Sequence, residues 1–163
     1  MQFSEKYEYP AGFDQIWEMY ADPEFHAQRL SAAQLEEATV NAHLDGDDLT
    51  VELRGQVSPE AIPAQVSRFV KGRLSLSLME TWHRTGSEAT GRMTVDISGA
   101  PVKIGAELAL TSPAAALTER AMTGDLKVSI PLLGPRLEKE AMRFIPMLVN
   151  AELSAAEAWL SSH

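Results

Sequence analysis

Cysteine is absent from the 163-residue chain. This absence excludes disulfides, thiol nucleophiles, iron–sulfur clusters and thiolate zinc sites. Long hydrophobic runs are also missing, since no stretch of about 18 successive apolar residues occurs. Residues 1–6 show no basic segment followed by an apolar run. We therefore expect a cytoplasmic protein without a membrane-inserted segment.

Positive charge is scarce in this chain. Lysine and arginine total 14 against 23 aspartate and glutamate residues, which gives a formal net charge of −9. Such a balance argues against binding to nucleic-acid phosphates or anionic lipid surfaces. The 45% hydrophobic content is enough to build a sizeable core. We expect residues 1–163 to form one domain.

The motifs of several enzyme classes are missing as well. There is no Gly-x-Ser-x-Gly elbow, no Gly-x-Gly-x-x-Gly and no phosphate-binding loop. Hydrolase and nucleotide-binding functions thus lose their main support, and no cofactor is expected. The four histidines lie far apart without a His-x-x-x-His spacing, which favours surface histidines over a metal site. They are His26, His43, His83 and His163.

Alternation of apolar and polar residues is abundant. It predicts an opening strand at 2–9, then two short helices at about 13–20 and 23–33, then about six more strands. These strands are expected at 38–44, 49–53, 74–82, 91–97, 102–110 and 122–130. Short connections and alternation throughout favour an antiparallel meander with one buried face.

A segment that cannot be regular strand interrupts this series. Residues 58–63 contain two prolines, and Ile62, Val66 and Phe69 recur at helical spacing, which predicts a loop or a short helix. Such an insertion could cover an opening in the molecule. Ile62 and Phe69 are candidates for a gate there, and a permanent plug is the alternative.

Residues 135–161 have the period of one long amphipathic helix, with a kink expected at Pro146. A single late helix must lie against a sheet already made, and a curved sheet around one helix leaves a hollow. Glu152 falls in the middle of the apolar helix face. Either Glu152 faces the hollow or the kink turns it toward solvent, and the second interpretation is favoured.

Glu80 is a second acid in an apolar pattern, because it has the inward parity of Leu78 and Trp82. It faces a cavity, is exposed at a rim or bulge, or pairs with a cross-strand base. If both acids point inward, they form a polar anchor or an acid–base pair. Tyr7 and Tyr9 share one strand face, where their hydroxyls orient a ligand or, alternatively, sit at a rim.

Several short motifs resemble those of a known superfamily. The opening is similar to that of START-like, birch-pollen-allergen-like proteins (the SRPBCC superfamily), and later motifs resemble one uncharacterised family within it. The opening motifs are Tyr9-Pro10-Ala11, Ile16-Trp17, Ala21-Asp22-Pro23 and Phe25. The later motifs are Glu80-Thr81-Trp82, Gly99-Ala100-Pro101 and the stretch from Gly124 to Gly134, which leads into Leu137-Glu138. Together they span nearly the whole chain.

The resemblance implies an α+β helix-grip fold, in which a curved antiparallel sheet of about seven strands wraps around a long C-terminal helix. Two short helices lie between its first and second strands. Superfamily members bind lipids, hormones or polyketides between sheet and helix, and a minority are cyclases, aromatases or oxygenase domains. The resemblance also places His26 beside the cavity.

The expected function is to bind a small apolar or amphipathic molecule, lipid- or polyketide-like, between sheet and helix. The residues expected to contact it are Tyr7, Tyr9, Glu80, Trp82, Met93, Leu108, Ile145 and Glu152. One alternative is a cyclase- or dehydratase-like enzyme that uses Glu80, Glu152 or His26 as acid or base. The other is an interaction module whose packed interior has no cavity.

Overall fold

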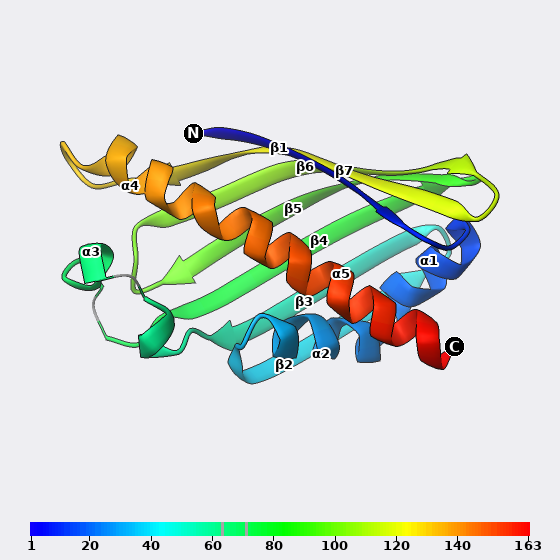
Figure 1. The fold of residues 1–163 in the computed structure, drawn as a ribbon, viewed down its shortest axis with the longest axis horizontal. Coiled ribbons are helices and arrows are strands. Elements are labelled where there is room, and N and C mark those ends of the chain that lie inside the picture. Colours follow the sequence, from blue (N-terminus) through cyan, green and yellow to red (C-terminus); the bar gives the residue numbers. More distant parts are fainter. Residues whose placement is uncertain (63, 71) are drawn as a thin grey trace.

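The computed structural model describes residues 1–62, 64–70 and 72–163. One antiparallel sheet of seven strands runs in the order β1-β7-β6-β5-β4-β3-β2 (Figure 1). The strands are β1 (Gln2–Tyr9), β2 (Glu36–Asp45), β3 (Asp48–Gln56), β4 (Ser75–Thr85), β5 (Glu88–Ser98), β6 (Val102–Ala114) and β7 (Leu117–Val128). From β2 to β7 each strand pairs with the next one along the chain, and β1 then pairs with β7.

Helices cover one face of this sheet. Two short helices join β1 to β2, and a 3-10 turn with a single helical turn joins β3 to β4. Two further helices follow β7, and the longer of them, α5, runs diagonally across the sheet with α2 packed beside it (Figure 1). The bounds are α1 (Phe13–Ala21), α2 (Pro23–Ala32), η1 (Pro59–Ala61), α3 (Ala64–Ser67), α4 (Gly134–Ala141), η2 (Met142–Phe144) and α5 (Ile145–Ser162). This is the α+β helix-grip arrangement expected.

The helix expected over residues 135–161 is interrupted in the structure. Pro146 has no amide hydrogen to give to the carbonyl of Met142, so the chain tightens into η2 and α5 begins at Ile145. Leu148, which the uninterrupted period places on the inward face, is 47% exposed. Glu152 is nevertheless 5% exposed and faces the sheet, so the favoured interpretation of Glu152 was wrong.

The last strand also differs from its expected bounds. It begins at Leu117 and ends at Val128, so Ile130 lies outside it and Arg120 lies inside it. The inward parity of β7 therefore includes Arg120 together with Met122 and Leu126, all buried.

Local chemistry sets the position of α2. Asp22 precedes a proline and has extended backbone, which ends α1. Its side chain accepts a hydrogen bond from the amide of Glu24, and Pro23 occupies the first turn, where it is well tolerated. The Asp22 carboxylate also accepts a 2.7 Å hydrogen bond from the Trp159 indole. One residue thus begins α2 and attaches it to the end of α5.

Candidate functional site

Four charged side chains meet inside the molecule, and we call them the buried charge cluster. They are Arg29 from α2, Glu80 from β4, Arg120 from β7 and Glu152 from α5. Nη2 of Arg120 lies 3.0 Å from Oε1 of Glu80, and Nη1 lies 3.2 Å from Oε1 of Glu152. Nη2 of Arg29 lies 3.1 Å from Oε1 of Glu80 and 3.0 Å from Oε2 of Glu152. Two positive and two negative charges therefore cancel.

Neutral donors complete the bonding of the two carboxylates. The Trp82 indole donates to Oε2 of Glu80 over 3.1 Å, and the Tyr9 hydroxyl donates to Oε1 of Glu152. The Tyr20 hydroxyl lies 2.7 Å from the Tyr9 hydroxyl and accepts a 3.0 Å hydrogen bond from Arg120. Every carboxylate oxygen in the cluster thus has at least one donor, as buried charges require.

The pairing keeps these groups ionised. Burial alone would raise the pKa of Glu80 and of Glu152, but the guanidinium groups of Arg120 and Arg29 outweigh burial and hold both pKa values below the usual range. Burial likewise works to lower the pKa of each arginine, and the two carboxylates hold it above the usual value. An acid–base pair needs a member that exchanges its proton near neutral pH, and this arrangement opposes that.

His26 is buried, which corrects the expectation of a surface histidine. Its Nδ1 lies 3.0 Å from Nη1 of Arg29, which can only donate, so Nδ1 accepts and Nε2 carries the proton toward the Tyr20 carbonyl at 2.6 Å. Burial, reinforced by the charge of Arg29, lowers the pKa of His26 to about 4. His26 is therefore a neutral residue that positions Arg29. The histidines His43, His83 and His163 are exposed.

The inward side chains are least exposed around the buried charge cluster and become more exposed away from it. Along β6 the inward side chains go from 0% exposed at Leu110 to 3% at Leu108 and 8% at Ala106, and Ile104 and Val102 are half-buried. Leu78 and Leu76 on β4 and Ile97 on β5 are likewise half-buried toward the turn at residues 99–101. Five half-buried residues that pack against the core form a partly exposed apolar surface, which we call the apolar groove: Leu76, Leu78, Ile97, Val102 and Ile104.

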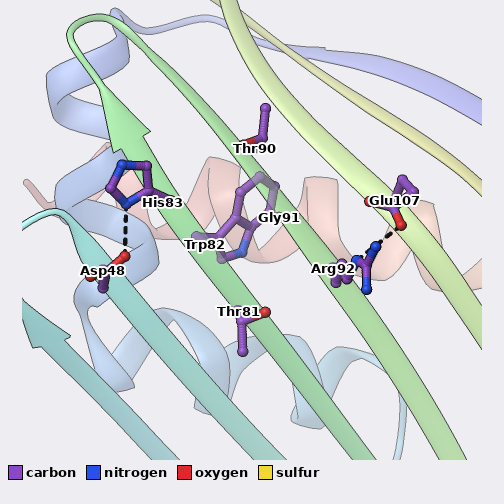
Figure 2. A pocket seen from close by; sticks show the side chains of 8 residues that line it. All are labelled: Asp48, Thr81, Trp82, His83, Thr90, Gly91, Arg92 and Glu107. Atoms are coloured by element: carbon purple, nitrogen blue, oxygen red, sulfur yellow. Dashed lines mark hydrogen bonds and ion pairs between the residues drawn. The ribbon is translucent and has the colours of Figure 1, made fainter.

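The described residues line at least two hollows at the surface. One, of about 320 Å³, lies near the open end of the apolar groove and is lined by Phe69, Gly99, Ala100, Pro101 and Ile130. The other, of about 310 Å³, lies on the sheet face opposite α5 (Figure 2). Its charged groups are already paired, His83 with Asp48 at 2.7 Å and Arg92 with Glu107 at 3.0 Å. Neither hollow is lined by Met93, Leu108 or Ile145.

The residues expected to contact a ligand fall into two groups. Tyr9, Glu80, Trp82 and Glu152 converge in or on the buried charge cluster. The apolar residues Met93, Leu108 and Ile145 belong to the hydrophobic core, with 8%, 3% and 6% of their surface exposed. Tyr7 is buried beside Tyr9, with ring centres 5.9 Å apart, and is 9% exposed.

The proposed gate residues lie at the other end. Ile62 and Phe69 are both half-buried in the segment between β3 and β4, and Phe69 packs against the core. Phe69 also lines the hollow beside residues 99–101, a position that suits either a gate or a plug.

The sequence pattern does not identify three members of the site. Arg120 precedes the strand expected at 122–130, so the alternation of that strand does not include it. Arg29 lies on a short helix of weak amphipathicity, and the only signal for it is its spacing of three residues from His26. Tyr20 falls at the end of the helix expected at about 13–20, and an apolar helix period gives no signal for a hydroxyl bonded inside the molecule.

None of the helices formed by the described residues has both the length and the apolar character needed to cross a bilayer.

Comparison with known proteins identifies the fold. The family model described as "Protein of unknown function (DUF2505)" matches residues 4–160. The Zhui aromatase/cyclase from Streptomyces sp. R1128 superposes with a TM-score of 0.60 and 15% identity, covering 96% of this chain and 90% of that one. Norcoclaurine synthase from Thalictrum flavum superposes with a TM-score of 0.61 and 12% sequence identity, covering 100% of this chain and 87% of that one. Human STARD10 superposes with a TM-score of 0.63 and 10% sequence identity, covering 99% of this chain and 66% of that one. No curated protein matches the sequence significantly.

Proposed function

Because the chain belongs to the DUF2505 family of proteins of unknown function and has the START-like helix-grip fold, we propose that it binds a small apolar or amphipathic molecule between the sheet and α5. The observation that carries the proposal is the apolar groove. Its side chains point toward the interior, yet they stay half-buried, while the inward positions beyond them are sealed.

The groove is continuous across three strands. Leu76 of β4 pairs directly with Ile97 of β5, and Val95 of β5 pairs with Ile104 of β6, so the side chains form one apolar surface. Apolar surface left in contact with water costs about 25 cal/mol for each Å² that a ligand would cover. A ligand that lies along these residues recovers that free energy, and a polar ligand does not.

The buried charge cluster closes the inner end of the groove. Its four charges are bonded to one another and to Trp82 and Tyr9, so no charge is left over to attract an ion. The cluster thus acts as a polar wall, and the ligand contacts the apolar residues between that wall and the open end, with Met93 and Ile145 on its route. Ile62 and Phe69 control access from the surface.

The acid–base enzyme is the less supported alternative. Glu80 and Glu152 converge, as such an enzyme requires, but both are held ionised by Arg29 and Arg120, and His26 is held neutral by the same environment. A general acid at neutral pH has to keep its proton until the reaction, and neither carboxylate does so.

A groove-filling substitution tests the proposed function. Ile104→Trp places an indole in the groove, whereas the control Thr94→Trp places one on the exposed opposite face of the neighbouring strand. Binding is measured by the fluorescence of 1,6-diphenylhexatriene, a hydrocarbon that emits when it leaves water. We expect Ile104→Trp to weaken binding of the hydrocarbon by roughly tenfold, because the indole occupies apolar surface that the ligand would otherwise cover. Thr94→Trp should bind the hydrocarbon like the original protein.

Two results would contradict the proposal. One is that the original protein does not bind the hydrocarbon at all. The other is that Ile104→Trp binds it as well as Thr94→Trp does, which would place the binding outside the groove. Native mass spectrometry of the purified protein provides a second measurement, since a retained small molecule adds mass that Ile104→Trp should lose.

A further inference from the structure

Leu132, in the loop between β7 and α4, is an apolar residue that lies entirely on the outside of the protein. It is 101% exposed, and its φ of 67° is in the left-handed region, which asparagine or glycine adopts more easily than leucine. The loop is nevertheless held by hydrogen bonds, since the amide of Gly134 donates to the Ile130 carbonyl over 2.9 Å. A bonded turn therefore presents this leucine to the surroundings, at a cost to the folded chain.

The surface that leads to Leu132 is also partly apolar. Ile130, Phe69 and Pro101 line the hollow of about 320 Å³ described above. The amide of Ser129 donates to the Pro101 carbonyl over 2.9 Å, which holds the loop against the turn between β5 and β6. Figure 1 shows α3, this turn and the loop before α4 at one end of the molecule, with the C-terminus of α5 at the opposite end.

Unpaired positive charges accompany this apolar surface. Lys6, Arg84 and Arg92 each form an ion pair with an acidic side chain, and so do Arg73 and Arg143. By contrast, five exposed cations in the segments around the hollow and along α4 make no ion pair with any described residue: Arg68, Lys103, Lys127, Arg136 and Lys139.

The arrangement of these cations is unfavourable for the isolated fold. Lys103 and Lys127 are directly opposite each other on β6 and β7, a register in which like charges repel. Asp96 is opposite Lys103 on β5 and offsets part of this repulsion. Arg136 and Lys139 are exposed and three residues apart on α4, so they are also neighbours of like charge. These positions suit a negatively charged partner.

The acids of α4 are bonded elsewhere. Oε1 of Glu138 accepts a 3.1 Å hydrogen bond from the Val128 amide, and Oε2 of Glu140 lies 3.3 Å from Nη1 of Arg143. The whole chain carries −9, which would repel an anionic surface if the charge were spread evenly. Because the unpaired cations gather at one end, that end can approach such a surface while the acidic remainder faces away.

We propose that this end of the molecule binds reversibly to an anionic lipid bilayer, through what we call the docking surface. Leu132 enters the region between headgroups and acyl chains, and the cations lie against the lipid phosphates. Each apolar side chain buried there and each Lys or Arg near an anionic leaflet adds to binding. The docking surface consists of Arg68, Lys103, Lys127, Leu132, Arg136 and Lys139. This inference goes beyond the proposed function and does not depend on a ligand in the apolar groove.

The form of the docking surface favours a bilayer over a protein. A stable protein interface needs a large complementary area with an apolar centre. Here the fully exposed apolar part is a single protruding leucine among separate cations. A fluid layer of lipids can adapt to such a shape, because its headgroups move to meet each charge.

Cosedimentation with vesicles of phosphatidylcholine containing about 30% phosphatidylserine tests the proposal. The original protein should bind them, should bind vesicles of phosphatidylcholine alone at least tenfold more weakly, and should be released by about 0.5 M NaCl. Leu132→Asn should weaken binding by about tenfold, because a buried leucine side chain is lost. The control Leu44→Asn removes a partly exposed leucine of β2 and should leave the affinity within about twofold.

A pair of charge variants provides a second comparison. Arg136→Gln combined with Lys139→Gln should weaken binding to the same vesicles at least tenfold, because two charges near the lipid surface are lost. The control combines Lys6→Gln with Arg92→Gln, which lowers the net charge by the same amount at other places, and should bind within about twofold of the original protein. Asparagine suits left-handed backbone, so Leu132→Asn should unfold at or above the temperature of the original protein.

Three results would overturn the proposal: the original protein does not bind the vesicles with phosphatidylserine, Leu132→Asn binds them as well as Leu44→Asn does, or both charge variants weaken binding equally. A fourth is found by sedimentation velocity without lipid. If the original protein is a dimer and Leu132→Asn is a monomer, a second copy covers the docking surface. Binding of 1,6-diphenylhexatriene in solution should be unchanged in Leu132→Asn, so its absence in the original protein contradicts the proposed function alone.

Discussion

The guanidinium group of Arg120 makes both ionic and aromatic contacts in the interior. It pairs with both acids of the buried charge cluster and lies 5.5 Å from the Trp82 ring and 5.7 Å from the Tyr20 ring. A planar cation with several donors suits such a position, because it can bond to carboxylates at its edge while aromatic rings cover its faces. The cluster therefore requires an arginine at this position, because a lysine ammonium is not planar and cannot bond to both carboxylates while the rings cover its faces.

Loss of this cation should destabilise the folded protein. Arg120→Met removes the charge and keeps an apolar side chain, which leaves Glu80 and Glu152 to share Arg29. We expect the free energy of unfolding in urea to fall by about 3–5 kcal/mol, because a buried carboxylate loses its partner. The matched control is Arg92→Met, which breaks an exposed pair with Glu107 and should cost less than about 1 kcal/mol. Equal effects of the two substitutions would refute the importance given to the cluster.

Buried His26 makes the stability of the folded protein depend on pH. Burial lowers the pKa of His26 to about 4 from an ordinary 6.5, so the unfolded chain binds more protons than the folded one between these values. The stability that neutral His26 supports is complete above pH 6.5 and is lost as the pH falls toward 4. For this single group we expect a loss of about 2 kcal/mol in the free energy of unfolding between pH 7 and pH 5.

The variant His26→Gln isolates that effect, because glutamine keeps a donor and an acceptor but does not titrate. Its unfolding free energy, measured in urea at pH 7 and at pH 5, should change about 2 kcal/mol less than that of the original protein. An equal change in the two proteins would show that the pH dependence comes from other groups. The depressed pKa values of Glu80 and Glu152 contribute at lower pH, where these carboxylates would begin to protonate.

Two residues of the buried charge cluster could be predicted from the sequence. Glu80 and Glu152 could be found because each is an acid in an apolar period, a pattern that a single sequence shows directly. Their partners could not be found in this way. Arg120 depended on where the last strand begins, and Arg29 on how α2 packs against α5. Both are facts of tertiary structure, and the direction in which Glu152 points depended on them too.

Asp22 connects helix α2 to helix α5 through its side chain. One carboxylate oxygen caps the first turn of α2, and the other accepts from the Trp159 indole. We expect Asp22→Ala to lower the free energy of unfolding in urea by about 2 kcal/mol, the sum of a lost cap and a lost, partly buried hydrogen bond. The control Glu18→Ala, exposed on α1, should stay within about 0.5 kcal/mol. A loss of less than about 0.5 kcal/mol in Asp22→Ala would contradict this role.

The break between α4 and α5 shows what a periodic pattern can and cannot predict. The presence of Pro146 predicted a kink, because proline cannot donate within a helix. The pattern gave no measure of the rotation that the intervening 3-10 turn introduces, and that rotation exposes Leu148 and still directs Glu152 inward. Positions on either side of such a proline therefore need separate helical wheels.

For the whole molecule, the fold was predictable because two independent signals agreed. Alternation along almost every strand indicated an antiparallel meander, and the short motifs from Tyr9 to Phe25 resembled the opening of a helix-grip protein. The depth to which the interior is filled was not predictable. It depends on how closely α5 approaches the sheet, which the structure shows as the change from sealed to half-buried side chains along β6.

The buried charge cluster also has a consequence for how the chain folds. Its members come from four elements, and Glu152 belongs to α5, which follows all seven strands in chain order. A sheet with α2 in place but without α5 would hold Arg29 and Arg120 against Glu80 alone, with a surplus positive charge that keeps water between the layers. Docking of α5 neutralises that charge and allows the interior to dry in the same step. The late helix thus makes the final collapse a cooperative event, in which the sheet and its cover become native together.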